Sequence, residues 1–113
     1  MTMNDTQRRK AANEAVFREV NERVEGLQRA FAATENQPLH IVCECDRLDC
    51  AERLDVPVAV YERARADSAC FLVTPGHDDS TVEDVVEAGS SYVIVRKRPG
   101  EPEAIASRTD PRR

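Results

Sequence analysis

The stretch LHIVCECDRLDC, residues 39–50, decides the fold of this 113-residue chain. It carries three cysteines, Cys43, Cys45 and Cys50, in a Cys-x-Cys-x4-Cys pattern. Alternate residues of a strand point to the same face, so a strand over residues 39–45 lets Cys43 and Cys45 reach one ion. The polar residues 46–49 predict a tight loop that turns back and presents Cys50. We expect the chain to return from this loop as the second strand of a hairpin.

Three cysteines within eight residues favour a metal site, because thiolates are preferred ligands of Zn²⁺. A tetrahedral structural site needs a fourth ligand, and we favour His77, in a turn after a predicted strand over residues 70–73. Cys70 and His40 are the alternatives, although Cys70 fits a small buried hydrophobic residue and His40 alternates to the face opposite Cys43. With Zn²⁺ as the cofactor, the predicted metal ligands are Cys43, Cys45, Cys50 and His77.

Ordinary thiols and a disulfide are the alternatives to a metal in the cysteine cluster. Residues 1–17 contain no apolar run of the kind that a signal peptide needs, so we expect a cytoplasmic protein. Disulfides are rare in that compartment. A tight structural zinc contributes on the order of 10 kcal/mol to the folding of small domains. Such a contribution would offset a thin core, since aromatic residues make up only 4% of this chain.

Residues 10–37 have the pattern of an amphipathic helix. The apolar positions follow one another at intervals of three and four residues, which is heptad spacing: Phe17, Val20, Val24, Leu27 and Phe31. About two heptads are fewer than a coiled coil usually needs. Two interpretations therefore stay open. The helix packs on its own domain, or it pairs with a second copy of the chain as a homodimer or with another protein.

Residues 38–98 predict the zinc-binding body, with an α+β fold of short strands and two short helices. The first of these helices should begin near Asp55 or Val56, with Pro57 in its first turn, where a missing N–H costs nothing. The second should begin at Ser80 or Thr81 and turn three valines, Val82, Val85 and Val86, inward. Residues 92–95 predict the last strand.

Both ends of the chain are expected to be disordered. Residues 1–9 are polar. Residues 99–113 contain three prolines and Ile105 as the one large apolar residue. The basic residues from Arg96 onward could form a solvated tail that aids solubility, or they could contact an acidic partner or the acidic body of the same chain.

Composition and missing motifs narrow the function. The net charge of −5 disfavours a nucleic-acid coat, which needs a basic face. No stretch approaches the roughly 18 to 20 apolar residues of a membrane span. A site filled by four protein ligands has no open position for a catalytic water, and the His-x-Glu and Pro-Cys-x-x-Cys motifs of zinc deaminases are missing. We therefore predict a non-enzymatic adaptor or regulator acting through protein contacts. A zinc-thiolate redox sensor and a nucleic-acid-associated accessory factor are the alternatives.

Several segments together resemble a known group of proteins. They are IVCEC (41–45), CAER (50–53), YERARAD (61–67), FLVTPGH (71–77) and YVIVRK (92–97), together with NEAVFREVNERV (13–24) at the start. This set is similar to small actinobacterial-type proteins with a Cys-x-Cys-x4-Cys and Pro-Gly-His zinc motif. The resemblance implies that three cysteines and the histidine ligate one ion, and it leaves Cys70 out. It implies no activity. Pro57 stands where those proteins tend to have a threonine cap.

Overall fold

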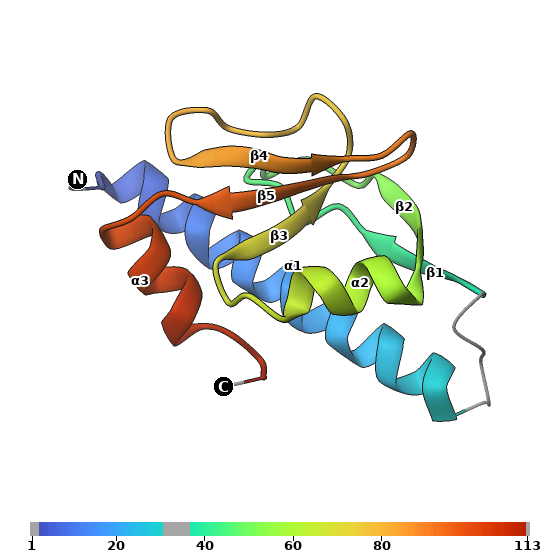
Figure 1. Cartoon of the computed structure of the whole chain (residues 1–113). Helices are drawn as coiled ribbons and strands as arrows, with labels where there is room; N and C mark the ends of the chain where they lie inside the picture. The colour runs from blue at the N-terminus through green and yellow to red at the C-terminus, as the bar shows by residue number, and fades with distance from the viewer. Residues whose placement is uncertain (1–2, 31–36, 113) are drawn as a thin grey trace.

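The computed structural model describes residues 3–30 and 37–112 and shows an α+β fold (Figure 1). A long N-terminal helix precedes two small antiparallel sheets, and two shorter helices complete the fold, which confirms the predicted fold class. The elements in chain order are α1 (Asp5–Ala30), β1 (Pro38–Val42), β2 (Arg53–Pro57), α2 (Val58–Arg65), β3 (Cys70–Val73), β4 (Glu83–Ala88), β5 (Val93–Lys97) and α3 (Glu101–Arg108).

The first sheet is the hairpin that the sequence predicts. β1 and β2 pair antiparallel, with Ile41 opposite Leu54 and Leu39 opposite Val56. These four side chains are buried, and the residues between them are more exposed, so one face of the hairpin lies on the core.

α2 begins slightly later than the sequence predicts. Strand β2 continues through Pro57, and the helix begins at Val58, so Pro57 is the N-cap and not a residue of the first turn. Pro57 has extended backbone angles, φ −60° and ψ 145°, and a proline also biases the residue before it towards extended geometry. The pairing of Val56 with Leu39 keeps that residue in the strand. From this start, α2 packs against both sheets.

The second sheet has the order β3-β5-β4, with antiparallel pairing throughout. Its central and first strands are almost entirely buried, and their two faces supply two different parts of the core. Leu72 and Ile94 pack with the hairpin and α2, whereas Phe71 and Val95 pack with the cysteines and α3. The segment that follows β1 joins the two sheets, because the Glu44 N–H donates to the Leu72 carbonyl of β3 at 2.8 Å.

The valines of residues 82–86 do not form the predicted helix. Residues Glu83–Ala88 form β4 at the edge of the second sheet, with a register shift between Val85 and Glu87. Val82 is buried, but Val85 and Val86 are about half exposed. The three-residue spacing of the valines fits a helix, yet β-branched side chains also favour strands. Pairing with β5 decides between the two.

α1 packs on the body mainly with a polar face, whereas the first of the two interpretations expected its apolar seam to make this contact. The residues of α1 that are buried in the body are Glu14, Arg18, Asn21 and Glu25. Of the predicted apolar seam, Phe17 and Val24 are half-buried, Val20 and Leu27 are exposed, and Phe31 lies outside the described residues. The seam therefore contacts the body only in part, with Val24 packed against the core, while the buried polar face binds charged and polar partners.

Residues 3–9 are ordered instead of frayed, and residues 1 and 2 of the predicted disordered segment lie outside the described residues. α1 begins at Asp5, not near Lys10. Asn4 and Gln7 cap its start reciprocally, because the Gln7 N–H donates to Asn4 Oδ1 at 2.8 Å and the Asn4 N–H donates to Gln7 Oε1 at 3.0 Å. Met3 is buried against the body.

Residues 99–113 also differ from the expected disordered tail, because they contain α3. Gly100 has φ +105°, a conformation that suits glycine, and Pro102 stands in the first turn of the helix. Pro102 and Ala106 are buried. Further along, the guanidinium of Arg112 pairs with Glu22 and Glu62. The charge of Arg112 is thus directed at carboxylates of the chain's own body.

Candidate metal centre

Cys43 and Cys45 lie in the extended segment that follows β1 and pairs with β3 of the second sheet through the Glu44 N–H. The Cys43 N–H donates to the Glu52 carbonyl at 3.0 Å, which holds this residue at the end of the β1–β2 hairpin. The Glu44 N–H then pairs with β3. This extended path points Cys43 and Cys45 to one side and Glu44 to the other. Both cysteines are buried in the part of the core formed with Phe71, Val73 and Val95.

Cys50 and His77 come to the same place from two loops. The Cys50 N–H donates to the Arg47 carbonyl at 3.2 Å, which closes the tight turn after Cys45. The His77 N–H donates to the Thr74 carbonyl at 2.9 Å in the turn after β3. Gly76 allows this turn because its φ is +86°. Arg47 ties the two loops together by donating to the Gly76 carbonyl at 3.0 Å.

The four predicted ligands form one cluster. Their ligand atoms all lie within 4.8 Å of one another, in a set composed of Cys43, Cys45, Cys50 and His77. The Nδ1 atom of His77 faces the cysteines, at 3.5 Å from Cys50 Sγ and 3.8 Å from Cys43 Sγ. Tetrahedral zinc with bonds of about 2.3 Å to sulfur would hold its ligand atoms roughly 3.8 Å apart. Contraction by about 1 Å would therefore bring this cluster to that geometry.

Burial sets the protonation of these thiols without a metal. It raises the pKa of Cys43 and of Cys45 well above the usual value for cysteine. The Thr74 N–H opposes this effect at Cys43, because it donates to Sγ at 3.1 Å and stabilises a thiolate there. Without a metal, Cys43 and Cys45 are therefore neutral thiols, and a divalent ion would have to displace their protons.

The two alternative fourth ligands lie elsewhere. His40 is exposed, and its Nδ1 contacts the carboxylate of Asp55 across the hairpin. Cys70 belongs to the part of the core formed with Leu39 and Tyr61. Burial and the nearby Asp67 raise the pKa of Cys70 to about 11. Among the described residues, only the predicted four gather in a group of this kind.

Glu44 is the residue near the site whose importance is not evident from the sequence. It lies between two cysteines, is fully buried and accepts hydrogen bonds from three elements. Asn21 of α1 donates to it at 2.7 Å, Arg65 of α2 at 2.8 Å, and the Leu72 N–H of β3 at 2.9 Å. These bonds fix the segment that carries the cysteines against α1, α2 and the second sheet.

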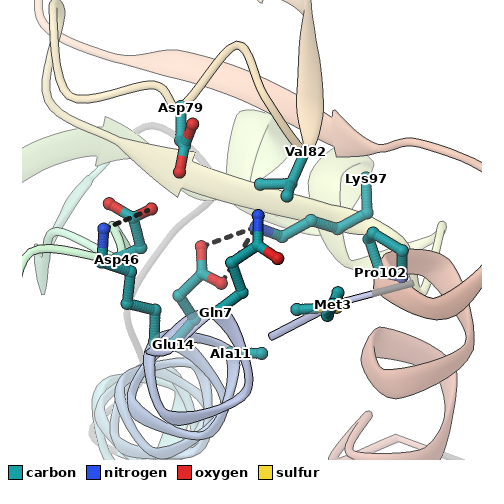
Figure 2. A pocket seen from close by; sticks show the side chains of 10 residues that line it. Met3, Gln7, Ala11, Glu14, Asp46, Asp79, Val82, Lys97 and Pro102 are labelled. Carbon is teal, nitrogen blue, oxygen red and sulfur yellow. Dashed lines mark hydrogen bonds and ion pairs between the residues drawn. The ribbon is translucent and has the colours of Figure 1, made fainter. Parts of the chain in front are cut away.

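A buried cluster of one lysine and two glutamates joins α1, β4 and β5, and Figure 2 draws its Lys97–Glu14 contact. The Lys97 ammonium contacts Glu14 at 2.8 Å and Glu83 at 2.6 Å. Burial raises the pKa of Glu14 to about 8, against the attraction of Lys97. The adjacent cavity measures about 20 Å³, and Figure 2 shows Met3, Val82 and Pro102 around it. A volume of this size holds about one water molecule, so it has no room for an organic substrate.

The spacing of polar residues in α1 indicates which face of the helix makes these contacts. Glu14, Arg18, Asn21 and Glu25 recur at intervals of four, three and four residues, which places them on one helix face. Arg18 is almost fully buried, donates to the Ser68 and Ala106 carbonyls, and lies over the Phe71 ring at 4.3 Å. A polar row with this spacing indicates a buried face whose partners are polar as well.

Comparisons with known proteins give one partial similarity. A 61-residue stretch, 54% of this chain, is 33% identical to pyruvate decarboxylase 3 of Oryza sativa subsp. indica and to the protein of the same name in subsp. japonica. The match covers 10% of the length of those proteins. No family model matches this chain, and no solved structure does. In the described residues, no helix has the length and apolar character needed to cross a membrane.

Proposed function

We propose that this chain is a small cytoplasmic zinc protein that acts as a non-enzymatic adaptor or regulator through protein contacts. The observation that carries the proposal is the convergence of three cysteines and His77 on one point between two sheets. Four protein ligands complete a tetrahedral site, which is typical of structural zinc. The ion would link the β1–β2 hairpin to the turn after β3. The actinobacterial-type proteins that the sequence resembles would share this site.

The rest of the molecule supports a role in contacts over one in catalysis. The cavity beside Glu14 and Lys97 holds about one water molecule, so it cannot admit an organic substrate. The basic residues near the C-terminus pair with the chain's own carboxylates. Arg96 contacts Asp67 and Glu103, and Arg98 contacts Asp84. This internal pairing reduces the charge that a nucleic acid would recognise.

A redox sensor is the second candidate, and the exposure of Cys50 favours it. Cys50 is only half-buried, so an oxidant could reach one thiolate of the zinc site. Cys70 is poorly placed to resolve an oxidised cysteine, because it lies in a different part of the core. Zinc release by peroxide within minutes, reversed by a thiol reductant, would favour the sensor over the adaptor.

Native mass spectrometry of untagged protein, purified without added metal, tests the zinc site. We expect one zinc ion per chain, lost to a strong chelator together with the folded charge-state distribution. His77→Ala and Cys50→Ser should lose the ion, whereas the controls His40→Ala and Cys70→Ser should keep it. Wild-type protein that contains no metal and four free thiols, or His77→Ala protein with one tightly bound zinc, would falsify the proposed site.

A further inference from the structure

The outward face of α1 carries an apolar stripe that the fold leaves uncovered. Val16, Val20 and Leu27 are 57%, 40% and 63% exposed. They lie roughly opposite the polar face that docks on the body, since each residue advances the helix by about 100°. Isolated exposed apolar residues are common, but three on one face of one helix form a contact surface. Figure 1 shows α1 along one side of the molecule, with the sheets on its other side.

We propose that this stripe pairs with the same stripe of a second copy of the chain, with the two α1 helices antiparallel. The proposal names the partner for the protein contacts of the proposed function and rests on that role, but it does not depend on the metal. Arg23 lies between the stripe residues on the same helix face. The four positions follow at intervals of four, three and four residues: Val16, Val20, Arg23 and Leu27. This spacing reads the same in both directions, as a two-fold interface requires.

Charge selects the antiparallel orientation. Arg23 interrupts the stripe, and its side chain is 79% exposed beside Glu19, which is 60% exposed. In a parallel pair in register, Arg23 would face the partner's Arg23, and like charges in contact are unfavourable. In an antiparallel pair, Val16 faces the partner's Leu27, and Arg23 packs beside the partner's Val20 and next to the partner's Glu19. The antiparallel pair thus replaces a repulsion with an attraction.

The surface around Val16 suits a side chain from a second helix. Val16 and Glu19 line a hollow between α1 and residues 108–111 at the end of α3. The same two residues line a second hollow with Val20 and Arg23. Knobs-into-holes packing needs such recesses between helix side chains. The antiparallel pair brings the partner's Leu27 to the first of them, and the two-fold axis repeats the contact at the other end.

Sedimentation velocity of the full, metal-loaded chain over a range of micromolar concentrations tests the association. Because three large apolar side chains per chain make a small interface, we expect a weak dimer with twice the 12.6 kDa chain mass. Leu27→Glu should weaken it about tenfold or more, since a charge would lose its water in the contact. Leu48→Glu is the matched control, because Leu48 is 66% exposed in the loop before Cys50.

Photo-cross-linking tests the orientation. A benzoylphenylalanine at position 16 should cross-link to the tryptic peptide of residues 24–29, which contains Leu27. This product can arise only between chains, because positions 16 and 27 of one helix are about 16 Å apart. A cross-link between the two copies of residues 11–18 would show a parallel pair and overturn the proposal. So would a monomer at all concentrations, or a dimer that Leu27→Glu leaves unchanged.

The two proposals fail separately. A monomeric protein that holds one zinc ion per chain, seen by native mass spectrometry of the same samples, overturns the pairing of α1 and leaves the zinc site standing. A dimer that contains no zinc overturns the zinc site and leaves the pairing of α1 standing.

Discussion

The side-chain amide of Asn21 donates to the carboxylate of Glu44 at 2.7 Å, and this bond joins α1 to the residue between Cys43 and Cys45. The same amide group also donates to the Val42 carbonyl and accepts from the Val42 N–H, both at 2.8 Å. One side chain of α1 thus binds the end of β1 and the start of the cysteine segment. The position of the helix and the geometry of the metal centre are therefore coupled.

Replacing Glu44 should strongly destabilise the fold. Glu44→Ala leaves Arg65 as a buried charge without its carboxylate, and breaking such a pair costs about 3–5 kcal/mol. Urea unfolding of the variant should show this loss in the free energy of unfolding. Glu52→Ala is the control, because Glu52 is exposed in the same hairpin. A loss below about 1 kcal/mol at Glu44 would contradict the structural role given to this carboxylate.

Removal of the metal should loosen α1 as well as the ligand loops. Without an ion, the cysteine segment loses its link to the turn that carries His77. Glu44, between two of the ligands, should then keep its bond to Asn21 less firmly. Hydrogen exchange after chelation should therefore rise in residues 38–50 and 74–77 and then in the middle of α1. The amides of β4 and β5 serve as the internal reference. If chelation changed exchange only at residues 74–77, metal binding and helix docking would be independent.

Stability should fall as the pH rises, because of Glu14. Burial raises the pKa of this carboxyl from 4.5 to about 8 in the folded state, so the native protein binds an extra proton between these values. The favourable term is complete below about pH 4.5 and is lost as the pH approaches 8, at up to about 1.4 kcal/mol per pH unit. Lys97, Glu83 and Asp46 are the charged groups that face Glu14.

Urea unfolding at several pH values between 5 and 8.5 measures this term as a difference between variants. Glu14→Gln should remove most of the downward slope, since glutamine does not titrate. Asp5→Asn is the control, because the Asp5 side chain is 95% exposed in the same helix. Equal slopes for the wild type and Glu14→Gln would assign the pH dependence to other groups, among them the cysteine thiols.

Arg18→Ala should release α3 from α1. Arg18 donates to the Ser68 and Ala106 carbonyls at 2.6 Å, and losing a hydrogen bond from a charged group costs about 1.5–3 kcal/mol. We expect a loss of roughly 2–5 kcal/mol in stability. Faster amide exchange across Glu101–Arg108 should accompany it. Arg9→Ala, at an exposed position of the same helix, should change neither quantity.

The candidate metal centre was predictable from the sequence because its geometry is mostly local. Strand alternation places Cys43 and Cys45 on one side and His40 on the other, and this does not depend on tertiary contacts. The polar loop returns Cys50 to them. The position of His77 needed one further assumption, namely that β3 runs beside the cysteine segment, and the Glu44–Leu72 backbone bond provides that contact.

The two ends of the chain were harder to predict, because their order depends on contacts with distant residues. Arg18, about 90 positions earlier, donates to the Ala106 carbonyl of α3, in the helix where Pro102 and Ala106 are buried. Met3 makes a similar distant contact, since its N–H donates to Glu101 at 3.2 Å. Composition describes the first segment as polar and the last as proline-rich, and it contains no information about these partners.

The spacing of neighbouring residues was enough to predict the α+β class, the hairpin and the grouping of the three cysteines. Tertiary structure alone decided which face of α1 is buried and whether Val82–Val86 form a helix or a strand. Apolar spacing favours burial of the Val20 and Leu27 side, but Glu44, Lys97 and the Ala106 carbonyl offer stronger partners to the polar side. Residues Glu83–Ala88 likewise form a strand because they pair with β5, with Val85 opposite Val95, and no local pattern encodes this pairing.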